Sequence, residues 1–443
     1  MKGGGGRFFG GVHPSYNKEY TDKAAIEVMP LPGKLVVFFA QNLGAPSRPV
    51  VKKGDEVLKG QVIAEAGGFV STPVHAPTSG RIDSIGMFPS PVGADSQAAV
   101  IIPDGRDEWA EGCDVERDVS SLDGEKIREM IHDGGIVGMG GATFPTHVKL
   151  SPPPEKKIDL LVVNGAECEP FLTADHRLMV EQPDGVIEGA ALLASVIGVK
   201  KVVVAVEKNK PDAIAAMRRH IDGRAGFSVR AMDVIYPQGA EKQLIYALTG
   251  RKVPAGGLPM DVGVLVQNVG TALASFEAVR YNRPLIRRVV TVTGSGVRRP
   301  ANVMARIGTT FEDLLEFCGG MTEETGKIIS GGPMMGVAQY SLDAAVTKGT
   351  SGLVLLEIDE TAQFVGDACV RCARCVDACP MRLNPSALSI FAERMRFEDA
   401  GEYNVMDCIE CGCCAYVCPS RRPMVHHFRR AKAEIRNMRK KTG

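Results

Sequence analysis

Eight of the twelve cysteines in this 443-residue chain fall into two copies of one spacing, C-x-x-C-x-x-C-x-x-x-C-P. The first copy comprises Cys369, Cys372, Cys375 and Cys379, and the second comprises Cys408, Cys411, Cys414 and Cys418. Thiolates at this spacing can hold a [4Fe–4S] cluster, because the short steps let three sulfurs of one loop reach three corners of a cube. Such clusters move single electrons, so the chain is predicted to carry electrons.

The two runs resemble the ligand run of two-cluster bacterial ferredoxins, in which the fourth cysteine ligates the other cluster. We therefore predict two ligand sets: Cys369, Cys372, Cys375 and Cys418 for one cluster, and Cys408, Cys411, Cys414 and Cys379 for the other. Structural zinc sites favour a CxxC pair repeated after a longer gap, and disulfide frameworks favour short secreted chains. The remaining cysteines are predicted to serve packing: Cys113, Cys168, Cys318 and Cys413.

The composition is that of a globular protein of about three or four domains. Basic and acidic residues balance at 52 each, so the net charge favours neither nucleic acid nor an acidic partner. The longest apolar runs, at residues 160–163 and 353–356, are far shorter than the roughly 20 residues of a membrane-spanning helix. No signal peptide is recognised, and cysteines assigned to clusters or left unpaired fit a reducing cytoplasm.

The C-terminal end is strongly basic. Residues 421–443 contain nine lysines and arginines and one acid, Glu434. A basic, partly helical tail of this kind could lie on an anionic membrane face or attract an acidic partner such as a ferredoxin. The alternative is a solvated helix face with a frayed end.

Residues 30–105 are rich in glycine, proline and β-branched residues, in short pieces. Residues 50–61 and 74–82 each read as strand, turn and strand. Two such halves resemble the biotinyl/lipoyl-type barrel-sandwich, which carries its prosthetic group on a lysine at the hairpin between the halves. The corresponding residues 66–71 contain no lysine, so we expect a docking or scaffold module.

Residues 125–290 alternate strands and helices, which predicts βαβ units around a mostly parallel, buried sheet. The expected strands are residues 158–163, 201–206, 231–236 and 262–266, and the expected helices are residues 185–196, 212–221 and 241–248. Residues 288–355 predict a smaller β-rich piece, with a strand at 289–293, a helix at 311–317 and a turn-rich loop at 331–336.

Two loops of the α/β region could bind a ligand. Residues 134–145 form a glycine-rich stretch, in which the backbone can approach a planar ring or a phosphate closely. Residues 164–170 follow an apolar strand and contain Asn164, Glu167 and Glu169. Polar groups at the carboxyl end of a parallel strand lie where such sheets bind ligands, although the two glutamates could also be ordinary loop acids.

Four motifs in order resemble the NADH-oxidising flavoprotein subunit of respiratory complex I. Residues 138–146 with Lys149 resemble its FMN loop, and residues 164–170 resemble its acidic nucleotide loop. Residues 239–244 and 268–271 resemble its third and fourth motifs. The resemblance implies non-covalently bound FMN, and NAD(H) as the substrate.

The resemblance also implies roles for single residues. Three glycines would pack on the flavin: Gly138, Gly140 and Gly141. Its ribityl chain or phosphate would be bound by Asn164, Asn268 and Thr271. Phe144 would stack on the nicotinamide nucleotide beside Lys149, and Glu169 and Glu241 would hold its ribose and amide end. Glu167, in the same loop as Glu169, is a further candidate cofactor-binding residue; no catalytic side chain is expected.

Over its whole length the chain resembles the C subunits of Rnf complexes, with residues 10–14 and 30–32 adding to the match. Rnf complexes are ion-translocating ferredoxin:NAD⁺ oxidoreductases of bacterial and archaeal membranes. The resemblance implies an oxidoreductase subunit, peripheral on the cytoplasmic face of the cell membrane. It would pass a hydride between NAD(H) and FMN and single electrons through two clusters to other subunits. The implied partners are those subunits, NAD(H) and, through the complex, ferredoxin.

Two other functions remain open. The chain could be a related reductase that serves a corrinoid or an amino-acid reductase system. It could also be a flavin-free electron-relay scaffold, because three polar residues of the flavoprotein motifs are replaced by Met139, Ala166 and Ala240.

These observations predict a multidomain α/β protein. We expect a barrel-sandwich within residues 1–120, a parallel-sheet FMN/NADH-binding domain at 121–287 and a small β-grasp-like domain at 288–358. A two-cluster ferredoxin-like helical domain would follow at 359–425, and a basic tail at 426–443.

Overall fold

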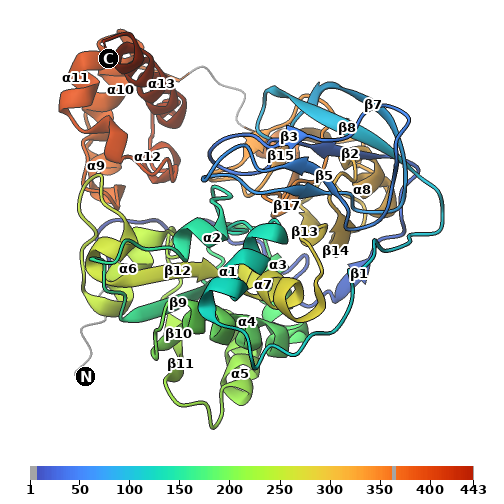
Figure 1. Ribbon diagram of the computed structural model, residues 1–443. Coiled ribbons are helices and arrows are strands. Elements are labelled where there is room, and N and C mark those ends of the chain that lie inside the picture. Colours follow the sequence, from blue (N-terminus) through green and yellow to red (C-terminus); the bar gives the residue numbers. More distant parts are fainter. Residues whose placement is uncertain (1–6, 362–365, 443) are drawn as a thin grey trace.

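The computed structural model describes residues 7–361 and 366–442, with side chains described as far as residue 440. These residues form a barrel, a parallel α/β unit, a unit built on a six-stranded sheet, and a helical unit that carries the cysteine runs (Figure 1). The barrel and the six-stranded sheet lie side by side, and the helical unit lies over the α/β unit near α6 (Glu241–Thr249). The predicted multidomain α/β architecture is confirmed.

The barrel is built from two small sheets with a shared core. One sheet has the order β2 (Leu35–Phe38), β8 (Asp95–Pro103), β7 (Gly80–Pro89) and β4 (Glu56–Val57), and the other has the order β3 (Arg48–Pro49), β5 (Val62–Glu65) and β6 (Val74–His75). Alternate residues of a strand point to one face, and Leu35, Ile63, Ile82 and Ile101 are fully buried between the sheets. The lysine-free residues 66–71 connect β5 to β6.

The α/β unit contains a parallel sheet with the order β11 (Phe227–Met232), β10 (Val202–Glu207), β9 (Leu160–Gly165) and β12 (Val264–Asn268). Its helices are α1 (Gly124–Asp133), α2 (Thr146–Lys149), α3 (Ala174–Glu181), α4 (Pro183–Val196), α5 (Pro211–His220), α6 and α7 (Val269–Tyr281). Alternate residues of β9 enter different cores, Leu161 and Val163 on one face and Val162 on the other. Both faces of the sheet are covered, which explains the continuous apolar runs.

One predicted strand of this sheet was misplaced. The sequence favoured residues 231–236, but the edge strand β11 ends at Met232. Because β11 has a neighbour on one side only and is largely exposed, its side chains are mixed, and no apolar run marks it. The apolar residues that follow leave the sheet, and Tyr236 instead pairs with Val12.

The third unit is a mixed six-stranded sheet that carries one helix, as expected for a β-grasp-like domain. Its order is β1 (Ile26–Val28), β14 (Ala301–Arg306), β13 (Arg287–Thr293), β17 (Gly352–Glu357), β15 (Thr325–Ser330) and β16 (Val337–Ala338). Helix α8 (Phe311–Phe317) contributes Phe311 and Leu314 to its core. The edge strand β1 comes from the N-terminal region, which the sequence had assigned as a whole to the barrel domain.

Residues 7–25, here called the N-terminal arm, lie outside the barrel and connect two other units. Val12 exchanges backbone hydrogen bonds of 2.8 and 2.9 Å with Tyr236 of the α/β unit. The Gly11 amide donates to the carbonyl of Ala378 in the helical unit at 3.0 Å. Gly10 has a φ of +71°, and a Cβ there would lie 2.8 Å from the same carbonyl oxygen, so the close approach requires glycine.

The helical unit is an internal repeat. Its helices are α9 (Arg374–Ala378), α10 (Pro385–Glu393), α11 (Phe397–Glu402), α12 (Cys413–Tyr416) and α13 (Met424–Thr442). Corresponding positions of the two cysteine runs share left-handed backbone conformations: Arg371 and Glu410 each have a φ of 57°, and Ala373 and Gly412 have φ values of 62° and 79°. The two runs therefore fold as the same local structure.

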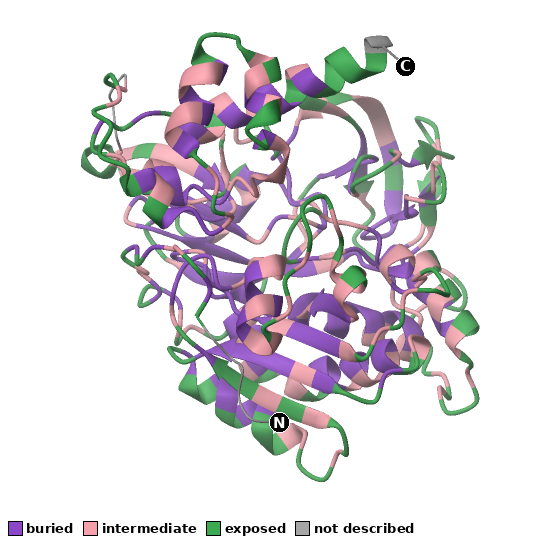
Figure 2. Ribbon diagram, turned by 90° about the vertical axis from the view of Figure 1, so that its left-hand side faces the viewer, coloured by how far each residue is buried: buried purple, intermediate pink, exposed green. Residues whose placement is uncertain are grey.

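Helix α13 belongs to the core of the helical unit. Phe428, Ala431 and Ile435 are buried against Leu388 of α10 and neighbouring residues, and the end of α13 is exposed (Figure 2). The boundary predicted at residue 425 thus falls inside one helix, and the first half of the predicted tail is packed. Among the described residues, no helix is long and apolar enough to cross a membrane.

Replacing Phe428 with alanine tests this packing. Phe428 is 1% exposed, and loss of a buried aromatic side chain costs roughly 3–5 kcal/mol. We expect Phe428→Ala to lower the urea concentration at which cluster absorbance is lost. The exposed Arg436→Ala, on the same helix, is expected to change stability by less than about 0.5 kcal/mol. Equal midpoints for the two variants would contradict a packed α13.

Candidate functional site

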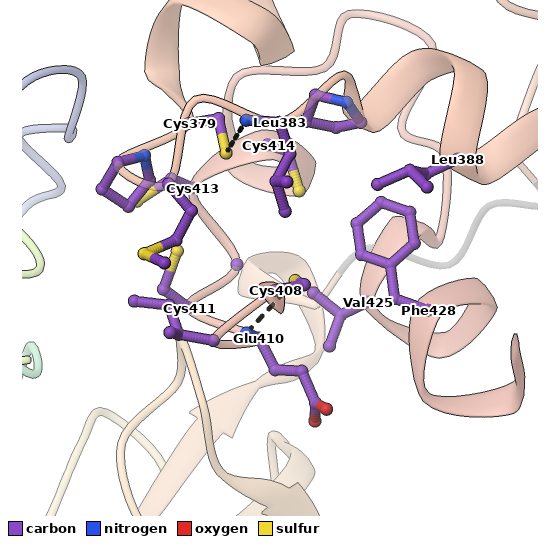
Figure 3. Close-up of a pocket in the computed structure, with 15 residues that line it drawn as sticks. Cys379, Leu383, Leu388, Cys408, Glu410, Cys411, Cys413, Cys414, Val425 and Phe428 are labelled. Carbon is purple, nitrogen blue, oxygen red and sulfur yellow. Dashed lines mark hydrogen bonds between the residues drawn. The ribbon is translucent and has the colours of Figure 1, made fainter. Parts of the chain in front are cut away.

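A cavity in the helical unit contains one of the two predicted ligand sets. Cys408, Cys411 and Cys414 of the second run line it together with Cys379 of the first run (Figure 3). Apolar side chains close its other walls, among them Leu388 and Phe428. The fourth cysteine of the first run therefore joins three cysteines of the second run, as the spacing predicts. Four thiols in one largely apolar cavity fit a [4Fe–4S] cluster.

Backbone amides also point at the sulfurs of this set. The amide of Glu410 donates to Cys408 Sγ at 3.3 Å, and the amide of Leu383 donates to Cys379 Sγ at 3.4 Å. Hydrogen bonds to ligand sulfurs are one of the means by which a protein tunes cluster potential.

The other ligand set lies nearer the surface. Burial raises the pKa of the Cys375 thiol, and the charges of Cys418 and Cys369 raise it further. Cys372 is exposed, and the amide of Arg371 donates to Cys369 Sγ at 3.4 Å. Among the described residues, no three His, Cys, Asp or Glu side chains could hold a single metal ion. In a [4Fe–4S] cluster each thiolate binds its own iron.

The helical unit sits directly on the loop that follows β9. The Tyr236 hydroxyl donates to the Cys411 carbonyl at 2.8 Å and lies 3.3 Å from Glu169 Oε1. Cys413 and Cys168, which the sequence assigned to packing, are buried in the same apolar contact. One cluster loop and one predicted nucleotide loop thus meet in a single interface.

The candidate flavin crevice lies where the strand order reverses. The chain passes from β9 outward through β10 to β11 and then returns to β12 on the other side of β9. Ligands of parallel sheets bind at such a reversal, beyond the carboxyl ends of the strands. Asn268 ends β12, and its register partner Asn164 is the last residue but one of β9. A Cβ on Gly140 would lie 2.7 Å from Asn268 Nδ2. The structure brings these three predicted residues together.

The glycine-rich loop is held by Thr271. The Met139 amide donates to Thr271 Oγ1 at 2.9 Å, and that hydroxyl donates to the Val137 carbonyl at 3.2 Å. The Gly138 amide donates to the Phe144 carbonyl at 2.9 Å, which closes the loop. Gly140 and Gly141 at its tip are exposed, and Gly141 has open space around it. Gly141, which faces open space, and Gly140, which lies against the Asn268 side chain, fit a planar ring with polar substituents.

Two of the three replacements in the flavoprotein motifs lie in the protein interior, and Ala240 is half-buried. Met139 is 7% exposed and packs in the core below the glycine-rich loop, and Ala166 is 6% exposed in the core on the other face of the sheet. Their apolar side chains therefore contribute to the support of the two loops.

Two residues that the sequence did not indicate lie beside this crevice, the half-buried Asp175 and the buried Arg288. Asn268 Nδ2 donates to Asp175 Oδ2 at 2.6 Å, and burial raises the pKa of Asp175 to about 7. Arg288 donates to the Met139 carbonyl at 3.5 Å, and burial lowers its pKa to about 10. Each is paired with a residue more than 90 positions away along the chain, and no local pattern marks them.

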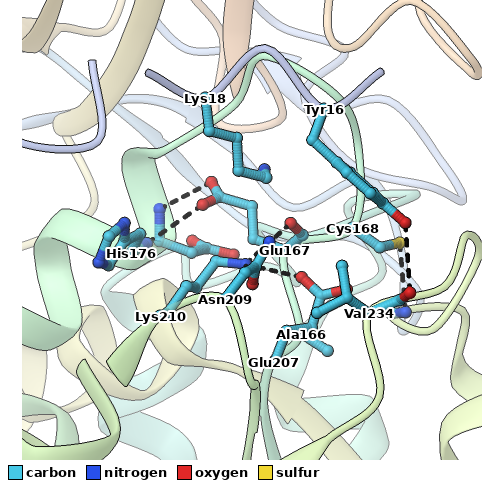
Figure 4. A network of polar contacts seen from close by, with 12 residues as sticks. Tyr16, Lys18, Ala166, Glu167, Cys168, His176, Glu207, Asn209, Lys210 and Val234 are labelled. Carbon is cyan, nitrogen blue, oxygen red and sulfur yellow. Dashed lines mark hydrogen bonds and ion pairs between the residues drawn. The ribbon is translucent and has the colours of Figure 1, made fainter. Parts of the chain in front are cut away.

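Glu167 is a structural residue in this arrangement. Its carboxylate accepts hydrogen bonds from the amides of Asp175 and His176, at 2.9 and 3.2 Å, and thereby caps α3. A buried network surrounds it (Figure 4), in which Lys210 pairs with Glu207 at 2.6 Å and donates to the Glu167 carbonyl at 3.3 Å. Both oxygens of the Glu167 side chain are therefore engaged.

The other polar candidates divide into two places. Glu169 accepts a hydrogen bond from the Met334 amide at 3.1 Å, and so faces the predicted loop 331–336 and the helical unit. Lys149 pairs with Glu241 at 3.0 Å and donates to the Val266 carbonyl at 3.2 Å, beside the end of β12. Lys149 and Glu241 thus remain next to the crevice, whereas Glu169 is engaged in a contact between units.

The barrel and the third unit also touch the glycine-rich loop. The Leu43 amide of the barrel donates to the Thr143 carbonyl at 3.1 Å. Lys348 of the third unit donates to the carbonyls of Gly135 and Pro73, at 2.7 and 2.9 Å, and burial lowers its pKa to about 7. The barrel thus docks on the loop, which agrees with the docking role expected of a barrel without a lysine arm.

Four family models match consecutive parts of the chain. They are described as the RnfC barrel sandwich hybrid domain (residues 6–106), the Nuo51 FMN-binding domain (131–276), the SLBB domain (289–338) and the 4Fe-4S dicluster domain (362–419). The matches to the FMN-binding and dicluster domains support the predicted cofactors.

Curated relatives match the chain over nearly its whole length. It is 50% identical over 430 residues to the C subunit of the proton-translocating ferredoxin:NAD(+) oxidoreductase complex of Clostridium ljungdahlii, covering 97% of this chain and 94% of that protein. It is 44% identical to the Na(+)-translocating counterpart of Acetobacterium woodii, with 98% of both covered. A solved NAD+-reducing [NiFe]-hydrogenase shares the fold, with a TM-score of 0.50 at 18% identity over 70% of this chain and 62% of that one.

Removing the Thr271 hydroxyl tests its role in the loop. Thr271→Val keeps the side-chain volume but removes two hydrogen bonds, which together contribute about 1–3 kcal/mol. We expect FMN to bind roughly tenfold more weakly, as measured by fluorescence titration, because the glycine-rich loop loses its support. Thr361→Val, in the third unit, is the matched control and is expected to leave FMN binding unchanged. Equal affinities would show that the hydroxyl does not order the site.

Replacing Glu169 with glutamine tests the contact between units by its pH dependence. Burial raises the pKa of Glu169 from 4.5 to about 7, so the folded protein favours the protonated carboxyl. Its contribution is therefore most favourable below about pH 4.5 and declines as the pH rises to about 7. Glu169→Gln is expected to flatten the loss of stability between about pH 5 and pH 8 in urea unfolding. Asp175 titrates in both proteins, so parallel curves would contradict the assignment.

Proposed function

The chain belongs to the family of C subunits of ion-translocating ferredoxin:NAD⁺ oxidoreductase (Rnf) complexes, and on that premise we propose that it is the NADH-side electron-entry subunit of such a complex. In this role it exchanges electrons with NAD(H), and its partners are the other subunits and, through them, ferredoxin. Ion translocation belongs to those partner subunits. The proposed location is the cytoplasmic face of the cell membrane.

The observation that carries the proposal is the single interface between the two cofactor regions. The loop of Cys411 lies on Tyr236, and Tyr236 contacts Glu169 in the loop that begins at the end of β9. A bound FMN supplies the link between the two-electron chemistry of NAD(H) and the one-electron chemistry of [4Fe–4S] clusters. The crevice and the cluster cavity are held together within one chain, as electron entry requires.

We assign roles to the crevice residues from their contacts. Asn164 and Asn268 lie at the carboxyl ends of β9 and β12, and Thr271 holds the backbone of Val137 and Met139, on either side of Gly138. The paired Lys149 and Glu241 lie beside the end of β12, where they would orient the nucleotide with Phe144. No side chain is needed as an acid or base, so the contribution of the protein is orientation and exclusion of water.

The eight cysteines of the two ligand sets are proposed to bind the clusters. Each set combines three cysteines of one run with the fourth cysteine of the other. Removing Cys372 is expected to eliminate one cluster, because its thiolate has no substitute in the exposed loop. Cys413→Ala alters a cysteine outside the spacing and is the matched control.

NADH titration of the reconstituted full chain tests the proposal. The wild type should contain about eight irons and bind FMN, and NADH should bleach the flavin and reduce the clusters. Cys372→Ala is expected to retain flavin bleaching and lose about four irons. Clusters without FMN binding would favour a flavin-free relay, and loss of bleaching in Cys372→Ala would contradict the proposed separation of hydride and electron transfer.

A further inference from the structure

The internal repeat places two equivalent loops in opposite surroundings. Residues 370–374, here called the outer loop, correspond position by position to residues 409–413, here called the inner loop. The matching φ values of Arg371 and Glu410 and of Ala373 and Gly412 show that the two loops have the same backbone shape. Differences between their surroundings therefore come from what each loop contacts.

The inner loop is a docked surface. Cys411, Gly412 and Cys413 are buried, and a Cβ on Gly412 would lie 2.8 Å from the Met334 carbonyl oxygen. The Cys411 carbonyl accepts the hydrogen bond from Tyr236. The backbone shape that the two loops share, next to a predicted cluster site, thus already forms one interface within this chain.

The outer loop is exposed over its whole length. Val370 is 66% exposed, and Cys372, a predicted cluster ligand, is exposed beside it. A cluster ligand at the surface provides a short path for an electron, and an exposed apolar side chain next to it provides area that a partner can bury. The outer loop therefore has the shape of the inner loop without the inner loop's contacts.

The charges of the two loops are also reversed. Glu410 of the inner loop is neutralised by Arg429 at 2.9 Å and Lys432 at 2.7 Å, both from α13. In the first repeat, α10 is the helix equivalent to α13, and its Glu393 corresponds to Lys432. Glu393 forms an ion pair with Arg422 at 2.8 Å. Glu393 is therefore not available to neutralise Arg371.

Arg371 and Arg374 consequently carry free charges at the outer loop. Within the described part of the chain, neither guanidinium has a hydrogen-bond or ion-pair partner, and both residues are exposed. The exposed carboxylates of Asp367 and Asp377 lie before and after the loop along the chain, whereas the two arginines flank Cys372 itself. Planar guanidinium groups pair well with carboxylates of a partner.

We propose that the outer loop is the docking surface on which an iron–sulfur protein with an acidic face exchanges single electrons with this chain. This rests on the proposed function. One electron leaves the cluster held in part by Cys372 and enters the partner's cluster, or passes the opposite way; no bond changes and no proton moves. Arg371 and Arg374 set the register by pairing with carboxylates, and Val370 is buried in the contact.

Chemical footprinting tests the surface without relying on activity. The isolated chain and the assembled complex are treated with phenylglyoxal, and arginine modification is read by peptide mass spectrometry. Arg371 and Arg374 are expected to react in the isolated chain and to be protected in the complex, while Arg48, exposed on the barrel strand β3, reacts in both. Equal modification of Arg371 and Arg374 in the two samples would overturn the proposal.

Charge reversal then tests electron exchange in the complex. A glutamate fits the left-handed backbone at 371, because Glu410 has the same φ in the inner loop. We expect R371E/R374E to keep its iron content and flavin bleaching by NADH, and to lose roughly tenfold or more in the rate of cluster reoxidation by the other subunits at low salt. That rate should also lose most of its dependence on ionic strength.

The controls separate the docking surface from the proposed function. R436E reverses an exposed charge of α13 and is expected to transfer electrons at the wild-type rate; an equal loss there would assign docking to α13 and overturn the outer loop. R371Q/R374Q, which removes the charges without adding new ones, is expected to show a smaller loss in the same direction. Normal bleaching with unchanged onward transfer in R371E/R374E overturns only the docking surface, whereas a wild type without bleaching overturns the proposed function.

Discussion

The contact of the inner loop with Tyr236 is the constraint on which the remaining arrangement depends. Electron transfer requires a short separation between centres, and here a contact between two units must provide it. The Tyr236 hydroxyl bonds the Cys411 carbonyl, while its backbone pairs with Val12 of the N-terminal arm. The arm in turn bonds the Ala378 carbonyl of α9, so the helical unit is fixed at two points of its repeat. The glycines of the arm allow this close approach, because a Cβ on Gly10 would collide with Ala378.

The glycine-rich loop depends on a similar convergence. Glycine backbone is costly to order, and its own sequence offers few side chains to hold it. Thr271 supports it from the α/β unit, Leu43 bonds it from the barrel, and Lys348 bonds its beginning from the third unit. Each of the three units thus contributes a hydrogen bond that orders this loop. This contact gives a physical reason for a barrel that has no lysine arm. Its contribution is a fixed surface rather than a moving group.

The parts that the sequence predicted are those whose signal is local. Cysteine spacing predicts the ligand sets because each run folds over a few residues, and Cys379 lies in one cavity with Cys408, Cys411 and Cys414, as expected. The central strands were located because burial on both faces makes them apolar throughout. Edge strand β11 is half exposed and lacks that signal. The N-terminal arm, Asp175 and Arg288 owe their positions to partners more than 90 residues away, which no local pattern encodes.

The two halves of the repeat have different surroundings, although their cysteine spacing is the same. Two loops with one backbone shape would, in isolation, give two equivalent clusters. The inner loop is buried against Tyr236 and Met334, and its acid is neutralised by α13. The outer loop keeps its arginines and its cysteine at the surface. Cluster potential responds to solvent exposure and net charge, so clusters bound in these two settings would have different potentials. The asymmetry arises because the inner loop is packed against the α/β unit. The outer loop is then the part of the repeat that faces outward.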